Sequence, residues 1–370
     1  MTVAEQLAEF VVRASFDALS VPVREQLKIR VLDALGCAIG ALDGEPIREI
    51  RKQLALFGGA PLCTLVGGER TAPDRAAFAT TALVRYLDFN DSYLSKIETC
   101  HPSDNLGAVL AAAEYAAKSG RDFLTALAVA YQVQCRLSDA APVRAKGFDH
   151  PTQGSYAVAA GVAKALGLDP GQTTNALGMC GAAFNALRVT RTNGLSNWAS
   201  LAYANTALGC THATFLAMLG ITGPRNVFDG TYGFKDVIAG PFQVDWATEP
   251  LDAVLRTDLK KYDADVHAQT ALEGILELRR NHGFGGDDVD RIEVDTYDVA
   301  YNIIGGGTEG ERLNVHTKEQ ADHSLPYLVA VAILDGQVMP EQSRPERIGR
   351  RDVQTLLHKV TVQRDGELSQ

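Results

Sequence analysis

The sequence lacks several patterns that would assign it to a common functional class. Its six cysteines include no CxxC or CxxxC pair, so neither a zinc ribbon nor a disulfide framework is indicated, and reduced thiols fit best. It has no run of about 18 apolar residues, so no transmembrane helix is expected. HExxH, GxSxG and Walker patterns are also missing. GGGTEG at 305–310 has the GxGxxG spacing but adjoins the wrong predicted element for a phosphate cradle, so we expect neither a metal nor an organic cofactor.

Basic residues are outnumbered as well. The chain has 35 Lys and Arg against 45 Asp and Glu, with no dense basic run, which disfavours nucleic acids and anionic membranes as partners. The N-terminus carries Glu5 and Glu9 within its apolar pattern and has no basic start, unlike a secretory signal. A cytoplasmic protein is therefore expected.

The length and the apolar spacing indicate two domains. A chain of 370 residues exceeds the roughly 250–300 at which one hydrophobic core stops growing. Up to about residue 250, apolar side chains recur at three- and four-residue spacing, as in Leu27, Val31 and Leu35, within segments rich in Ala and Gly. Small residues let helices approach closely, so residues 1–250 are predicted to form a large all-α domain.

The pattern changes near residue 250. Predicted helices over 265–281 and 318–335 alternate with strand-like segments, in one of which Ile292 and Val294 alternate with charged residues. Residues 251–370 are therefore predicted to form a smaller α/β domain, and the fold class is mainly α.

Polar residues concentrate in one stretch that leads directly into an Ala-rich helix. Asp88 and Ser92 lie before it, and His101 follows a short loop. Ser103 or Asp104 is predicted to cap the next helix, since Asp, Asn and Ser favour turns and caps. That explanation leaves Asp88 and His101 unexplained, because polar groups between apolar helices need specific partners.

Three further histidines, His150, His267 and His323, stand where predicted helices begin. A single histidine at such a position is more often a structural donor than a catalyst. Their recurrence at helix N-termini, where anions bind, indicates a site for a polycarboxylate.

Cations are available to hold such a substrate. Arg188 and Arg191 lie in one motif, and Lys260 and Lys261 stand at the start of the second predicted domain. Arg can hold a carboxylate through two parallel hydrogen bonds, whereas Lys acts as a point charge. Solvation at the surface is the alternative for each, and for Lys261 it is the favoured one.

Five motifs together resemble the MmgE/PrpD family. They are YLDFNDSYLSKIETCHPSDN, GFDHP, LRVTRTNGLSNWA, LKKYDADVHAQTALE and ADHSLPYLVAVAILDG, in family order over nearly the whole chain. The resemblance implies a large all-α domain with a smaller α/β lid, a homodimer, and a cofactor-free site between the domains. It implies one of three activities on a polycarboxylate: dehydration of 2-methylcitrate to 2-methyl-cis-aconitate, decarboxylation of cis-aconitate, or epimerisation of iminodisuccinate.

The resemblance also places the family's site positions on this chain. They fall on Asp88, Ser92, His101, His150, Lys260 and His267, and His323 matches a further family motif. Ala199 stands where the decarboxylase branch has lysine, which argues against decarboxylation. Family members run past residue 370, so the lid is expected to lack closing strands, or the chain to be a fragment.

We therefore expect a carbon–oxygen lyase of propionate catabolism that dehydrates 2-methylcitrate or a related tricarboxylate. Asp88, His101 and His150 are the predicted catalytic residues. The predicted substrate-binding residues are Ser92, Arg188, Lys260, His267 and His323. An epimerase of iminodisuccinate-like dicarboxylates and a non-catalytic, shortened family member are the alternatives.

Overall fold

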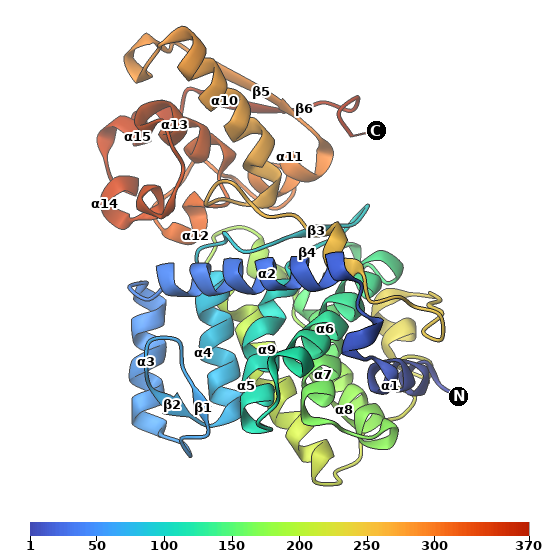
Figure 1. Ribbon diagram of the computed structural model, residues 1–370. Coiled ribbons are helices and arrows are strands. Elements are labelled where there is room, and N and C mark those ends of the chain that lie inside the picture. Colours follow the sequence, from blue (N-terminus) through green and yellow to red (C-terminus); the bar gives the residue numbers. More distant parts are fainter. Residues whose placement is uncertain (370) are drawn as a thin grey trace. The chain divides into compact units, whose positions relative to one another are not determined.

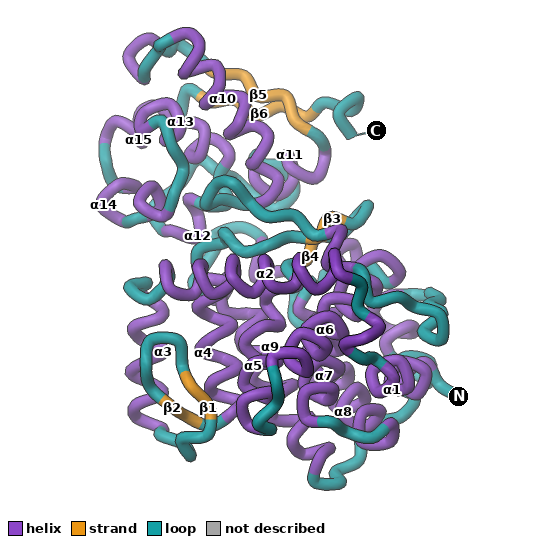
Figure 2. Tube along the Cα trace, in the orientation of Figure 1, coloured by secondary structure: helices purple, strands orange, loops and turns teal. Residues whose placement is uncertain are grey.

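The computed structural model describes residues 1–369, and contacts between Cα atoms divide them into two compact units. The first unit comprises residues 1–86, 90–188 and 200–259, and the second comprises 87–89, 189–199 and 260 onward. Helices predominate in both, and the strands form three two-stranded sheets among these residues (Figure 2). The mainly α fold class is confirmed. The predicted domain division after residue 250 stays a prediction, and the contact units interleave along the chain.

The first unit is helical apart from two short hairpins (Figure 1). Its helices are α1 (Val3–Arg13), α2 (Val21–Gly40), α3 (Glu45–Phe57), α4 (Pro73–Tyr86), α5 (Leu106–Tyr115), α6 (Gly120–Ala140), α7 (Pro151–Leu166), α8 (Pro170–Ala183) and all but the start of α9 (Trp198–Met218). The antiparallel pairs are β1 (Cys63–Thr64) with β2 (Arg70–Thr71) and β3 (Tyr93–Leu94) with β4 (Thr99–Cys100). Short turns are η1 (Phe16–Ala18), η2 (Pro102–Asn105), η3 (Arg144–Lys146), η5 (Lys235–Ala239) and η6 (Ala253–Arg256), and η4 (Arg188–Arg191) leads into the second unit.

Side-chain caps determine where several of these helices begin. At the start of α1 the Thr2 side chain accepts a hydrogen bond from the Glu5 backbone N–H, and the Glu5 carboxylate accepts one from the Thr2 backbone N–H. Ser119 and Asp122 form the same capping box at α6. Each box satisfies two backbone N–H groups that the first helical turn leaves without partners.

Small residues allow the central helices of this unit to pack closely. A Cβ atom added at Gly161 of α7 would lie 2.7 Å from Val109 of α5 and 2.9 Å from Ala130 of α6. Both distances are shorter than the side chains tolerate. The Ala and Gly content noted in the sequence thus permits the contact of α7 with α5 and α6.

The second unit combines short helices with one parallel strand pair. Its helices are α10 (Gln269–His282), α11 (Asp298–Ile304), α12 (Lys318–Ala321), α13 (Leu325–Asp335), α14 (Pro345–Ile348) and α15 (Arg351–Leu357). Strand β5 (Ile292–Thr296) pairs in parallel with β6 (Val360–Arg364), and Ile292 lies opposite Val360. Short turns are η7 (Val266–Ala268), η8 (Gly286–Asp288) and η9 (Pro340–Ser343).

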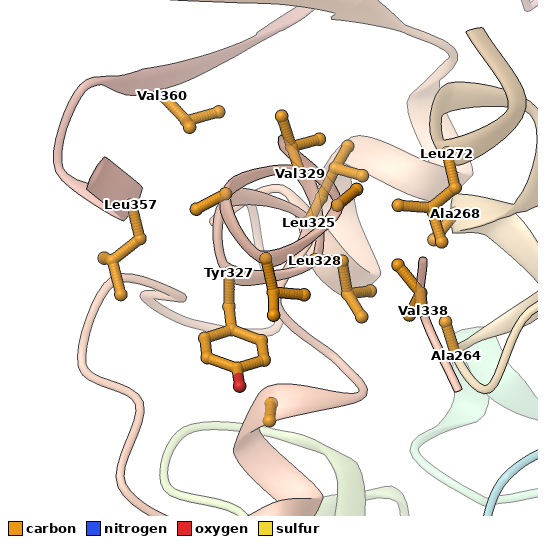
Figure 3. Packing of buried hydrophobic residues seen from close by; sticks show 14 of the residues in the cluster. Ala264, Ala268, Leu272, Leu325, Tyr327, Leu328, Val329, Val338, Leu357 and Val360 are labelled. Carbon is orange, nitrogen blue, oxygen red and sulfur yellow. The ribbon is translucent and has the colours of Figure 1, made fainter. Parts of the chain in front are cut away.

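Helix α13 forms the centre of the second unit's core. Its residues Leu325 to Ile333 are all buried, as expected for a helix that is apolar on every side. Figure 3 shows Leu328 facing the side where Leu272 of α10 lies, while Leu357 approaches from the opposite direction. The Tyr327 hydroxyl donates a 2.6 Å hydrogen bond to the Gln342 carbonyl, so the polar atom of this buried aromatic side chain has a partner.

One predicted element is wrong in detail. The predicted helix over 318–335 is two helices, α12 and α13, separated by Asp322 to Ser324. The Ser324 side chain accepts a hydrogen bond from the backbone of Tyr327 and so caps α13, with Pro326 in its first turn. The break places the side chains of Asp322 and His323 outside regular helix.

Within residues 1–369, no helix combines the length and the apolar character needed to cross a membrane.

The packing of α7 makes a testable prediction. Replacing Gly161 with Ala should destabilise the protein by about 1–3 kcal/mol, because the added methyl group overpacks the contact with α5 and α6. Gly274 of α10 is the control, because a Cβ there meets nothing within 4 Å, and Gly274→Ala should stabilise by roughly 0.5–1 kcal/mol. Urea unfolding measures both, and equal effects of the two substitutions would contradict the packing described.

Candidate active site

The predicted site residues gather in two clusters, one in each unit. The histidine cluster of the first unit comprises Ser92, His101, Asp104, Asp149, His150 and Arg188. The carboxylate cluster of the second unit comprises Asp88, Lys260, Asp263, Asp265, His267, Lys318, Asp322 and His323. Every residue of the two clusters except Arg188 is buried.

The β3–β4 hairpin brings Ser92 and His101 together. Tyr93 pairs with Cys100, so the residues just outside that pair lie beside each other, and Ser92 Oγ is 3.1 Å from His101 Nδ1. The same ring nitrogen is 2.9 Å from the Asp91 carbonyl oxygen. A carbonyl oxygen only accepts hydrogen bonds, so Nδ1 carries a proton and Nε2 is the nitrogen that can accept one.

His150 lies between two carboxylates. Its Nδ1 is 3.3 Å from Asp149 Oδ1, and its Nε2 is 3.6 Å from Asp104 Oδ2. Its ring stacks on Tyr203 with centroids 5.7 Å apart and meets His101 edge-on at 5.5 Å. Two imidazoles with distinct partners are therefore adjacent in the first unit.

Arg188 is part of this cluster through a carboxylate. Its Nη1 donates a 2.7 Å hydrogen bond to Asp149 Oδ1, the oxygen that also faces His150. A guanidinium presents five N–H donors in a planar fork, a geometry that suits carboxylates. The expected role of Arg188 in holding substrate stays a prediction.

The predicted capping role of Ser103 and Asp104 is wrong. Helix α5 begins after Asn105 without a side-chain cap. Asn90 instead donates hydrogen bonds of 2.9 Å to Ser103 Oγ and 3.0 Å to Asp104 Oδ1. Both side chains are buried, where a specific donor is worth more than a cap exposed to water.

Asp91 holds the turn that carries His101. Its carboxyl accepts hydrogen bonds from the Ser103 backbone at 3.0 Å and from the Tyr131 hydroxyl at 2.8 Å. Burial raises the pKa of Asp91 above its ordinary value, although these hydrogen bonds and Arg30 work in the opposite direction. The sequence analysis did not single out Asp91, because its burial is not visible in the local sequence.

In the carboxylate cluster, Asp88 and Lys260 form a buried ion pair. Lys260 Nζ is 2.9 Å from Asp88 Oδ1 and also donates to the Asp88 backbone carbonyl. Asp88 has a φ of +56°, a left-handed conformation that costs a residue with a Cβ roughly 1–2 kcal/mol. The two contacts with Lys260 stabilise this conformation and aim the carboxylate into the cluster.

The carboxylate cluster also contains two histidines. His323 Nε2 is 3.9 Å from Asp88 Oδ2 and 4.0 Å from Asp265 Oδ2. His267 Nδ1 lies 2.6 Å from the Tyr297 hydroxyl. Burial works to raise the pKa of Asp265, but the nearby His267, His323 and Lys260 outweigh it and the pKa is lowered.

The sequence analysis did not predict four members of the carboxylate cluster, namely Asp263, Asp265, Lys318 and Asp322. Lys318 Nζ is 2.5 Å from Asp322 Oδ2, and Asp322 Oδ1 is 2.6 Å from His323 Nδ1. Burial raises the pKa of Asp263 to about 7, and neither of its carboxyl oxygens has a hydrogen-bond partner among the described residues. The Asp-His dipeptides at 149–150 and 322–323, each just before a helix, were the available signal.

Asp88, Asp265 and His323 are also residue types that bind metals, and one ligand atom from each lies within 4.8 Å of the others. The Lys260 ammonium already contacts the Asp88 carboxylate and would repel a cation there. The donor set therefore fits acid–base chemistry better than metal binding.

The structure thus brings Ser92, His101, His150 and Arg188 together in the first unit. In the second it brings together Asp88, Lys260, His267 and His323. Lys261 is exposed and pairs with Glu273 at 2.6 Å, as favoured from the sequence.

Comparison with known proteins identifies the class to which this chain belongs. The sequence profile of the MmgE/PrpD N-terminal domain matches residues 5–247, and that of the MmgE/PrpD C-terminal domain matches residues 262–370. The chain belongs to the MmgE/PrpD family, and the resemblance seen in its motifs is confirmed.

Individual relatives carry more specific names. The chain is 29% identical to a probable 2-methylcitrate dehydratase of Saccharomyces cerevisiae, over 92% of this chain and 69% of the relative. It is 27% identical to the mitochondrial 2-methylcitrate dehydratase of Yarrowia lipolytica, over 100% of this chain and 73% of the relative. It is 26% identical to the 2-methylcitrate dehydratase of Salmonella typhimurium, over 90% of this chain and 72% of the relative.

The Asp88–Lys260 ion pair can be tested by a double-mutant cycle. Lys260→Met should destabilise the protein by about 3–5 kcal/mol, because it leaves the Asp88 carboxylate buried without its cation. The double variant Asp88→Asn/Lys260→Met should lose less than the sum of the single variants, with a coupling of about 0.5–3 kcal/mol in urea unfolding. Lys261→Met, at an exposed side chain, should change stability by less than about 0.5 kcal/mol. Strict additivity would contradict a direct pairing.

The raised pKa of Asp263 predicts how stability depends on pH. The pKa of Asp263 is about 7 in the folded state and 3.8 ordinarily, so protonation of Asp263 favours the folded state. This contribution to the free energy of unfolding is complete below pH 3.8 and is lost as pH rises through about 7. Between about pH 5 and about pH 8, the free energy of unfolding of the wild type should fall by on the order of 2–4 kcal/mol relative to that of Asp263→Asn, whose side chain cannot ionise. Urea unfolding of both proteins across this range provides the measurement, and parallel stability profiles would refute the assignment.

Proposed function

We propose that this protein is a hydro-lyase that dehydrates 2-methylcitrate, or a closely related tricarboxylate, to the corresponding cis-aconitate. Family membership and the names of the relatives support the substrate class. The observation that carries the chemistry is the anchored His101 imidazole, whose Nδ1 faces the Asp91 carbonyl oxygen and whose Nε2 is thereby set to accept a proton.

Dehydration breaks a C–H bond next to a carboxylate and a C–O bond on the adjacent carbon, and it forms a C=C bond and water. The reaction needs a base for the carbon-bound proton, an acid for the departing hydroxyl, and cations for the charge that develops on the carboxylate. Imidazole serves as both base and acid near neutral pH. In this proposal His101 and His150 carry out the proton transfers, and Asp88 acts as a base or orients a histidine.

The remaining candidate residues would bind the substrate. Lys260, Arg188 and His267 would hold carboxylates, while Ser92 and His323 would hydrogen-bond the substrate. Only Phe89, Asn90 and Asp91 separate Asp88 from Ser92 in the chain. Lys260 would also have a structural role, because it forms the buried ion pair with Asp88.

Replacing His101 with Asn tests this assignment. The Asn side chain can keep a donor near the position of Nδ1 but removes Nε2, so kcat for 2-methylcitrate should fall by about 10²–10⁴-fold. The free energy of unfolding should change by less than about 1 kcal/mol. The assay follows the ultraviolet absorbance of the new double bond conjugated to a carboxylate.

The control is His212→Asn, which alters an exposed histidine of α9 and should keep full activity. A loss of folding equal to the loss of activity in His101→Asn would indicate a structural histidine instead of a catalytic one.

The names of the relatives do not favour either of the two alternatives, and each alternative makes a distinct experimental prediction. An epimerase of iminodisuccinate-like dicarboxylates needs bases on two faces of one carbon, and it produces no new alkene absorbance. A non-catalytic family member would show no stabilisation by citrate-like ligands, whereas a true site stabilises the folded state by mass action.

We further propose that the protein is a homodimer in which α2 of each copy meets the other. Ile29, Leu32, Gly36 and Ile39 form one exposed face of α2, with Leu32 74% exposed. A two-fold pairing buries the same face of both copies, and Gly36 lets two helices approach closely at its centre.

Leu32→Glu should therefore convert the dimer to a monomer in sedimentation experiments, because it buries two like charges in the interface. Leu56→Glu, at an exposed leucine of α3, is the matched control and should leave the mass unchanged. A wild-type monomer, or a Leu32→Glu dimer, would exclude this interface.

We also propose that the enzyme works in the cytoplasm, in propionate catabolism. The support is that all six cysteines are free thiols in the structure, as is usual in a reducing compartment.

A further inference from the structure

We propose that Asp322 and Lys318 are positioning residues that keep a proton on Nδ1 of His323, so that Nε2 is the nitrogen that exchanges protons during the reaction. This inference rests on the proposed lyase function and deepens it. It assigns His323 a role in proton transfer in place of substrate binding alone.

The contact between His323 and Asp322 determines the tautomer. His323 Nδ1 lies 2.6 Å from Asp322 Oδ1, and an ionised carboxylate can only accept, so Nδ1–H is the donor. The Asp322 side chain is only 1% exposed, so water cannot replace this bond. A carboxylate that orients an imidazole in this way is the arrangement used to select a tautomer in hydrolytic triads and metal sites.

Lys318 donates a hydrogen bond to the other carboxyl oxygen of Asp322. Its Nζ donates a 2.5 Å hydrogen bond to Asp322 Oδ2 from one turn earlier in the chain. Burial alone would lower the pKa of Lys318, but Asp322 and Asp263 outweigh it and raise the pKa above its ordinary value. The two Asp322 oxygens therefore have separate partners, the Lys318 ammonium and the His323 ring.

The other ring nitrogen faces two carboxylates, one of which belongs to the proposed catalytic residue Asp88. His323 Nε2 lies 3.9 Å from Asp88 Oδ2 and 4.0 Å from Asp265 Oδ2. These separations are too long for direct hydrogen bonds, but an oxygen atom about 2.8 Å from each partner can bridge them. The charged groups around His323 are Asp88, Lys260, Asp263, Asp265, Lys318 and Asp322.

The same order of groups occurs in the histidine cluster. There Arg188 donates to Asp149, and Asp149 faces Nδ1 of His150, the residue directly before α7. In both units a cation, a carboxylate and an imidazole follow one another where a helix is about to begin. The separation of 3.3 Å at His150 makes that pair the weaker of the two.

Nitrogen NMR of the wild-type protein with labelled histidines tests the tautomer without any substrate. His323→Asn identifies the His323 signals. We expect Nδ1 with the shift of a protonated nitrogen and, at alkaline pH, Nε2 with that of an unprotonated one. The opposite assignment would overturn the proposal even if every Asp322 variant failed to fold.

Kinetics with Asp322→Asn tests the consequence. The amide no longer selects one tautomer, so kcat for tricarboxylate dehydration should fall by about 10²–10³-fold while KM changes less than about threefold. Asp322→Glu, which retains a carboxylate, should recover part of kcat. Asp335→Asn is the control, because Asp335 pairs with Arg347 in the same unit and outside the cluster.

The outcomes separate the two proposals. An active wild type with unchanged kcat in a folded Asp322→Asn would reject the positioning role alone. A wild type inactive on every tricarboxylate would reject the lyase function, while the NMR result would still decide the tautomer.

Discussion

The buried ion pair between Asp88 and Lys260 is the interaction on which the carboxylate cluster depends. Asp88 follows α4 in sequence but lies with the second unit, and it occupies a left-handed backbone conformation that few side chains tolerate. Lys260 contacts both its carboxylate and its carbonyl oxygen. Without this ammonium, the crowded carboxylates around His323 would repel one another in a buried environment that screens charge weakly.

Partial neutralisation of charge explains how so many ionisable groups can be buried together. With its imidazoles neutral, the carboxylate cluster holds four Asp and two Lys side chains, so the carboxylates exceed the cations by two. A raised pKa at Asp263 relieves part of this excess, because the group takes up a proton more readily than an exposed carboxyl. Such an environment suits proton transfer, since small changes in charge move protons between neighbouring groups.

The sequence predicted the helices of the first unit well, because their apolar faces repeat with the helical period over long segments. It predicted the individual histidines through motifs, but not their partners. Ser103 or Asp104 was predicted as a cap, but both are buried partners of Asn90, and local sequence carries no information about burial. The break between α12 and α13 was missed although Ser324 and Pro326 are typical of a helix start. That Asp88 packs with residues some 170 positions later depends on tertiary contacts, which no local pattern encodes.

The central claim is that anchored imidazoles in this fold remove water from a tricarboxylate. The most direct measurement is proton NMR of the purified protein incubated with a mixture of 2-methylcitrate, citrate, cis-aconitate and iminodisuccinate. The account predicts that 2-methylcitrate or citrate is consumed and the matching alkene appears, with iminodisuccinate unchanged beyond its rate without protein. Loss of stereochemical purity in iminodisuccinate, with both hydroxyl tricarboxylates intact, would contradict it.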